Sequence, residues 1–265
     1  MHSKWKMIIF CTFYNLLFEF SMRGISGFLD RFLAFWLFWV YFAFFNMVIH
    51  IAIISYGSER AVLASTATFG IIPATFVTGV VFINPDFTGL NTIILIIVLI
   101  VWWGILQTWF PLYMSGKLFG EQILDGKLNK IGWILCLVYI AVFTLIAFTG
   151  ATKGALHGYI ISIIIFSLLF IWTFIEIWKA NQVGKKELID NEQNLFDSRL
   201  LEFGFYATVI ISFISGLILP LFDKPIGDPH IYPKSLWLMS IWSILLMIIT
   251  LIYKLKEKKT FPLPY

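Results

Sequence analysis

Long runs of apolar residues, separated by short polar or turn-rich pieces, follow one another along the whole chain. A transmembrane α-helix needs about 20 apolar residues to cross the hydrocarbon core of a bilayer. The runs predict an all-α fold, a polytopic bundle of about eight transmembrane helices, at approximately 5–28, 32–55, 61–83, 92–113, 131–149, 158–179, 202–222 and 236–254. Residues 1–265 then form a single transmembrane domain, and we expect no soluble domain.

Two connecting segments are long enough to have a character of their own. Segment 180–201 mixes charged residues with Leu188, Ile189, Leu195 and Phe196, a pattern typical of an amphipathic helix on the cytoplasmic face. Segment 223–235 is rich in proline. Because proline cannot donate a backbone hydrogen bond, this segment predicts an irregular loop on the outer side.

Composition and charge support a membrane protein and suggest its orientation. Apolar residues make up 60% of the chain and charged residues 13%, and the mean hydropathy is +0.88. Soluble domains have about 25% charged residues, so lipid must surround most of this chain. Most of the 19 basic residues fall in the termini and alternate loops, which predicts that both ends are cytoplasmic. The composition fits a prokaryotic plasma membrane or an organelle inner membrane.

The first predicted span contains a stripe of polar residues at helical spacing. Residues four apart lie on one face of a helix, and this spacing joins Cys11, Asn15, Glu19 and Arg23, with Ser26 and Asp30 as an expected continuation. A carboxylate within a bilayer costs at least about 2.5–3.5 kcal/mol unless it is paired or hydrated. Two interpretations stay open: a functional carboxylate that handles an ion or proton, or an ion pair that merely ends a short span.

Other polar residues complete a candidate functional cluster. Asp30 and Arg31 precede the second span, and Asn46 and His50 lie one turn apart within it. A lone histidine in an apolar helix more often forms a hydrogen bond between helices than it carries out chemistry. The full candidate set is Asn15, Glu19, Arg23, Asp30, Arg31, Asn46 and His50.

Known catalytic and cofactor motifs are absent from the sequence. It contains no HExxH, Walker A or GxGxxG pattern, and its 4 histidines are scattered, which does not favour haem or di-iron ligation. We therefore expect no cofactor, no metal ligands and no catalytic residues, and an enzyme is the less favoured class. No basic run with interleaved aromatic residues is present, so we expect no nucleic-acid partner.

Three functional hypotheses follow. The first is a non-catalytic subunit that packs and positions partners in a larger membrane complex, such as an energy-converting or respiratory one. Few charges within the spans and short loops favour it, and its partners would be membrane lipids and other membrane protein subunits. The first alternative is a transporter or channel for a small solute, ion or proton that uses the polar stripe of the first span. The second alternative is a lipid-active membrane enzyme.

Overall fold

The structure of the protein is a computed structural model that describes residues 3–30, 33–72, 75, 80–82, 84–119, 134, 138, 141, 156–190, 199–226 and 231–257. Nearly all of these residues are helical. Among them, 6 helices are long and apolar enough to cross a membrane: Lys4–Leu29, Leu33–Ile54, Thr92–Phe119, His157–Gln182, Arg199–Phe222 and Pro233–Ile252. The all-α prediction is confirmed, and the helices indicate an integral membrane protein.

The helices follow the apolar runs of the sequence closely. Their bounds are α1 Ser3–Leu29, α2 Leu33–Ile54, α3 Glu59–Ile72, the 3₁₀-helix η3 Val80–Phe82, α4 Thr92–Ile96, the π-helix η4 Ile97–Trp109, α5 Phe110–Phe119, α7 Leu156–Asp190, α8 Arg199–Ile218, the 3₁₀-helix η7 Leu219–Phe222 and α9 Pro233–Glu257. α4, η4 and α5 follow one another directly and form one long helical segment. Asn91 caps it by accepting a hydrogen bond from Ile94, which satisfies one of the free N–H groups at a helix start.

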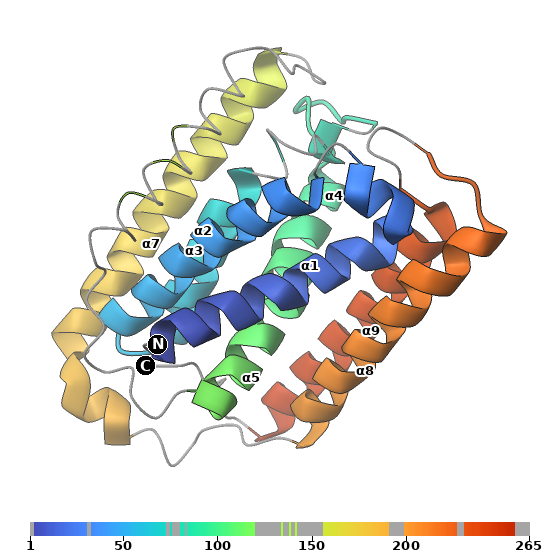
Figure 1. The fold of residues 1–265 in the computed structure, drawn as a ribbon. Helices are drawn as coiled ribbons and strands as arrows, with labels where there is room; N and C mark the ends of the chain where they lie inside the picture. Colours follow the sequence, from blue (N-terminus) through green and yellow to red (C-terminus); the bar gives the residue numbers. More distant parts are fainter. Residues whose placement is uncertain are drawn as a thin grey trace.

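Helix α1 lies in the middle of the bundle (Figure 1). It packs against α2, α5, α8 and α9. α7 lies on the side of the bundle opposite α8 and α9 and packs mainly on α3. Large side chains fill the space between α1, α2 and the η4 segment, where Phe44, Leu106 and Leu112 are fully buried. The outward faces of α7, α8 and α9 are apolar and exposed, as expected of helix sides that contact acyl chains.

The two ends of the bundle can be assigned from contacts between helices. α1 begins at one end, here called the amino-terminal end, where Asn181 of α7 donates a hydrogen bond to the carbonyl of Ile54 at the end of α2. At the other end, here called the far end, the N–H of Asn91 donates to the carbonyl of Val81. The ring of Phe82 there contacts Tyr159 near the start of α7, with 4.7 Å between centroids.

α1 bends sharply at Gly24, near the far end. Gly24 has φ 60° and ψ −173°, a left-handed conformation that glycine adopts without steric cost. The bend leaves carbonyl groups of the preceding turn without helical donors. Ser215 Oγ donates to the Ser21 carbonyl at 3.0 Å, and the Tyr232 N–H donates to the Met22 carbonyl at 2.9 Å. The α8–α9 hairpin is therefore joined to α1 at the bend.

Two predicted spans lie partly outside the described residues. Within the predicted span 61–83, α3 covers the first part, to Ile72, and η3 covers Val80–Phe82, and most of the residues between them lie outside the described part of the chain. The predicted span 131–149 falls almost entirely outside the described residues.

The structure describes parts of the two long connecting segments, which were predicted as an amphipathic helix and an irregular loop. α7 continues without a break to Asp190, so the first half of segment 180–201 extends a membrane helix instead of forming a separate amphipathic one. Its lysine and glutamate residues are good helix formers, which permits the extension. In segment 223–235, the described residues include a β-bridge between Ile226 and Ile231. α9 begins there, at Pro233.

Candidate functional site

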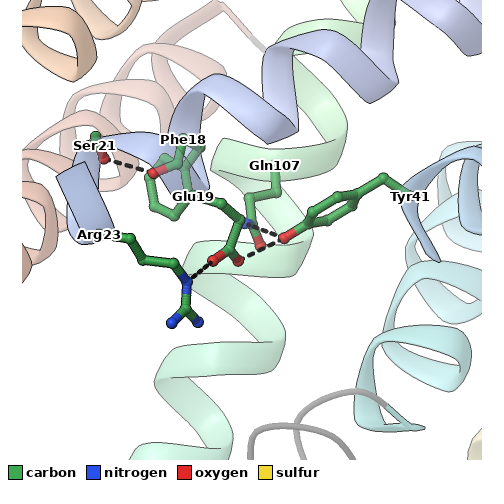
Figure 2. A network of polar contacts seen from close by, with 6 residues as sticks. All are labelled: Phe18, Glu19, Ser21, Arg23, Tyr41 and Gln107. Carbon is green, nitrogen blue, oxygen red and sulfur yellow. Dashed lines mark hydrogen bonds and ion pairs between the residues drawn. The ribbon is translucent and has the colours of Figure 1, made fainter. Parts of the chain in front are cut away.

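Five buried polar residues from three elements are joined by hydrogen bonds within the bundle, and Figure 2 shows four of them, Glu19, Arg23, Tyr41 and Gln107. α1 supplies Asn15, Glu19 and Arg23 at intervals of one turn, α2 supplies Tyr41, and the π-helix η4 supplies Gln107. Asn15, Tyr41 and Gln107 are at most 2% exposed, and Glu19 and Arg23 are 9% and 6% exposed. We refer to these five residues as the Glu19 cluster.

Glu19 is the acceptor at the centre of this cluster. The Tyr41 hydroxyl donates to Glu19 Oε1 at 2.7 Å, and Arg23 Nε donates to Glu19 Oε2 at 3.1 Å. Hydrogen bonds to charged groups contribute about 1.5–3 kcal/mol each. They reduce the cost of at least about 2.5–3.5 kcal/mol that an unpaired carboxylate would have inside a bilayer. The contacts thus stabilise the charged carboxylate.

The position of Glu19 along α1 places it away from both ends of the bundle. It lies about 24 Å from the start of α1, at 1.5 Å per residue, and the bend at Gly24 follows five residues later. The hydrocarbon core of a bilayer is about 30 Å thick. A bundle aligned across the membrane would hold Glu19 inside the half of the hydrocarbon core nearer the far end.

Asn15 and Gln107 connect α1 to η4. Asn15 Nδ2 donates to the carbonyls of Cys11 and Gln107 at 2.9 and 2.8 Å, and Gln107 Nε2 donates to the Tyr41 hydroxyl at 3.3 Å. The amide oxygens of both residues, Asn15 Oδ1 and Gln107 Oε1, are buried and accept no hydrogen bond from the described part of the chain. The cluster therefore offers unused acceptors.

The polar line continues along α1 toward the amino-terminal end. Cys11 Sγ donates to Ser115 Oγ of α5 at 3.5 Å, and Lys4, two turns further, is also buried. From Cys11 to Arg23 the line extends about 18 Å along the helix axis. Polar residues on one face of α1 thus run through most of the bundle's interior instead of marking only its end.

The π-helix η4 presents Gln107 to this line. π-helices are rare and usually short, and they occur frequently at functional sites; η4 covers 13 residues. Its wide turns bring Gly104 close to the Leu99 carbonyl, where a Cβ atom would lie only 3.1 Å from the oxygen. Trp103, also in η4, packs on the Tyr41 ring at 5.6 Å between centroids and so fixes the phenol against its partners.

The structure brings together three of the seven predicted site residues. Asn15, Glu19 and Arg23 belong to one network. Asp30 is half-buried beyond the bend at Gly24, so the expected continuation of the stripe through Ser26 and Asp30 is wrong: a left-handed residue changes the helix direction. Arg31 lies outside the described residues.

The two predicted residues of the second span lie elsewhere on α2. Asn46 and His50 follow Tyr41 by five and nine residues, which places His50 about 14 Å further along the axis toward the amino-terminal end. Asn46 is fully buried, and His50 is partly buried. Neither residue takes part in the hydrogen bonds that form the Glu19 cluster.

Sequence reasoning missed Tyr41 and gave Gln107 no functional role. Tyr41 is one of many aromatic residues in a continuous aromatic run, so its hydroxyl has no distinguishing sequence pattern. Gln107 is a single amide in an apolar segment, which is the signal that could have identified it. Only the pairing of α1 with α2 and η4 shows that both residues face Glu19.

No group of three or more His, Cys, Asp or Glu residues that could hold a metal ion occurs among the residues that the structure describes. The cluster has one carboxylate and neutral oxygen atoms, a set suited to hydrogen-bonding or singly charged ligands. Comparison of the chain with protein-family models, with curated proteins and with solved structures gives no match. Its function therefore has to be inferred from the chemistry of its own residues.

Proposed function

We propose that this chain is a membrane transporter or channel that moves a small solute, ion or proton along the buried polar face of α1. The observation that carries the proposal is the burial of the Glu19 cluster between α1, α2 and η4. Ionisable residues inside membrane spans are costly, and they commonly mark solute or ion pathways.

A purely structural ion pair at the end of a span would differ from this arrangement. Such a pair lies at the interface, where water hydrates both groups, and needs no further partners. Here the side chains of Arg23 and Glu19 are only 8% and 11% exposed, and the cluster continues through Asn15 toward Cys11. A packing scaffold gains little from a polar line of this length.

We further propose that the chain crosses the membrane eight times, with both termini on the cytoplasmic side. The chain leaves α2 at the amino-terminal end of the bundle and starts the next long segment at Asn91, at the far end. It leaves α5 at the amino-terminal end and re-enters α7 at the far end. These connections support one crossing each, in addition to the six candidate spans. The distribution of basic residues supports the orientation in a prokaryotic plasma membrane or an organelle inner membrane.

The proposal is tested with purified protein reconstituted alone into liposomes. Flux of protons, alkali ions and small neutral solutes is measured for the wild-type chain and for Glu19→Gln, which keeps the size of the side chain but removes its charge. We expect flux of one solute class in the wild type and at least a tenfold loss in the variant.

Glu176→Gln is the matched control. Glu176 is also buried and ion-paired on a membrane helix, with Lys179 of α7 at 3.0 Å, but it lies outside the polar line of α1. We expect its flux to remain within about twofold of the wild type. No flux of any solute class, or equal losses in the two folded variants, would contradict a transport role for the Glu19 cluster.

The expected role as a subunit of a larger membrane complex remains the second candidate. The exposed face of α7 favours it, since Leu168, Phe174 and Trp178 are each more than 60% exposed and α7 packs mainly on α3. Native mass measurement after mild solubilisation distinguishes the candidates. Stoichiometric partner chains, together with no flux by the isolated protein, would favour the subunit role.

A further inference from the structure

The hydrogen bonds of the Glu19 cluster leave two buried amide oxygens without a described donor. Asn15 uses both amide N–H groups on backbone carbonyls, and the Gln107 amide and the Tyr41 hydroxyl donate within the cluster. Asn15 Oδ1 and Gln107 Oε1, in contrast, have no described donor although their residues are at least 98% buried. Buried polar atoms are nearly always paired, so this imbalance points to a ligand.

Hydrogen bonds connect the residues that carry these oxygen atoms. Asn15 and Glu19 are one turn apart on the same face of α1. The Gln107 amide and the Glu19 carboxylate converge on the Tyr41 hydroxyl, as Figure 2 shows. The Glu19 carboxylate, beside Arg23, and the Gln107 amide are thus linked through Tyr41, and Asn15 is linked to the same residue of η4 through the Gln107 carbonyl.

We propose that the Glu19 cluster binds a small monovalent cation, which replaces the Arg23 guanidinium as the partner of Glu19. The proposal rests on the transport function proposed above and names the class of its cargo. Oxygen atoms of carboxylates and amides are the ligands of hard cations. Divalent cations fit less well, because their sites commonly contain several carboxylates and this one contains only Glu19.

Charge balance explains why the guanidinium must leave. Glu19 and Arg23 together are neutral, and a second cation beside them would leave a net positive charge in a buried site, which is strongly unfavourable. If Arg23 moves away as the cation enters, the charge around Glu19 remains balanced. Arg23 directly precedes the bend at Gly24, and long arginine side chains reach the membrane interface from nearby positions.

Other classes of ligand do not match this set of atoms. An anion would be repelled by the Glu19 carboxylate, and the donors of Asn15 and Tyr41 are directed to backbone carbonyls and to Glu19. A neutral solute would not displace Arg23 from a carboxylate. The exchange also gives Arg23 a specific role. Its guanidinium group is a tethered cation that occupies the site in the absence of cargo and competes with the cargo cation for Glu19.

The experiment measures binding separately from transport. The full chain is placed in nanodiscs of phosphatidylcholine, and the thermal midpoint is recorded against increasing NaCl, KCl or NH₄Cl, with choline chloride keeping ionic strength constant. A ligand that binds only the folded state raises this midpoint by mass action. We expect a saturable increase with at least one of the three cations, and the choice among them separates alkali ions from an ammonium-type cargo.

Two variants make the exchange testable. Arg23→Met removes the competitor and should tighten cation binding at least tenfold, whereas Asn15→Leu removes an oxygen ligand and should weaken it at least tenfold. If Arg23→Met is unstable in choline chloride, restoration of its folding by the bound cation is the expected result. A folded Arg23→Met protein with unchanged or weaker binding would overturn the exchange.

The possible failures are distinguishable. No midpoint shift with any of the three cations, in the wild type and in Arg23→Met, overturns the cation site. If that result accompanies flux of protons or neutral solutes in liposomes, the transport function stands and only its cargo class is wrong. Cation binding without any flux upholds the site and refutes transport.

Discussion

Replacing Tyr41 by phenylalanine removes one hydroxyl group and leaves the ring against Trp103. The variant loses a 2.7 Å hydrogen bond to Glu19, worth about 1.5–3 kcal/mol for a charged acceptor, and takes from Gln107 its acceptor at 3.3 Å. Hydrogen bonds measured in membrane proteins average only about 0.6 kcal/mol and reach about 1.7, because the unfolded chain also finds partners. We therefore expect a loss of about 2 kcal/mol in the free energy of unfolding.

The measurement is reversible unfolding in mixed detergent micelles, followed by tryptophan fluorescence. Tyr206→Phe is the control, because it removes a hydroxyl from a tyrosine that is 54% exposed on α8, and it should change stability by less than about 0.5 kcal/mol. A double-mutant cycle with Glu19→Gln isolates the contact between the two side chains. Residues in one hydrogen-bonded network couple by about 0.5–3 kcal/mol, and we expect about 1 kcal/mol here.

A clear result would refute this reasoning. If Tyr41→Phe matches Tyr206→Phe in stability, the hydroxyl makes no net contribution. If the effects of Tyr41→Phe and Glu19→Gln simply add, the two groups do not interact in the folded protein. Either outcome would leave Glu19 without the buried partner from α2 on which the site depends.

Further variants test the bend, the helix packing and the loop before α4, residues 84–91, here called the far-end loop. Gly24→Ala should destabilise the protein by about 1–2 kcal/mol, because an L-residue is strained at this positive φ and its Cβ would lie 2.8 Å from Pro220; an unchanged unfolding midpoint would contradict the bend. Gly216→Val should separate α8 from α1, since even a Cβ would lie 2.4 Å from the Phe20 ring; unaltered cross-linking between cysteines placed on the two helices would argue against this contact. Hydrogen bonds from two neighbouring threonines lower the pKa of Asp86 in the far-end loop. Since this pKa is depressed in the folded state, the carboxylate stabilises the loop fully above its unfolded pKa of about 3.9, and the effect decreases progressively as the pH falls from that value toward the lower folded pKa. The midpoint difference between wild type and Asp86→Asn should therefore shrink from pH 6 to pH 3, and a constant difference would refute the assignment.

The positions of most helices were predictable because they depend on local composition. A run of apolar residues has to form its hydrogen bonds internally in lipid, and a helix does so with any apolar sequence of sufficient length. The starts of α2 and α4 agree with the predicted spans to within a residue. The third predicted span, 61–83, stays a prediction beyond Ile72, because most of its later residues lie outside the described part of the chain.

The continuation of the polar stripe beyond Gly24 could not be predicted from spacing. A repeat of four residues implies a common face only while the helix remains regular. Glycine in a membrane helix is compatible with regular geometry, and its left-handed conformation here accompanies contacts with Pro220 and Tyr232 from the α8–α9 hairpin. Those contacts are distant in sequence, so no local pattern contains them.

Apolar runs and residue spacing are enough to identify a helical membrane protein whose first helix has one polar face, because both properties are local. The partners of this face become known only from the packing of the helices. Tyr41 and Gln107 lie 22 and 88 residues from Glu19 along the chain and become its neighbours because α2 and η4 pack against α1. The physical reason is that a polar group in lipid must find partners, but its own sequence specifies only that need and not which helix satisfies it.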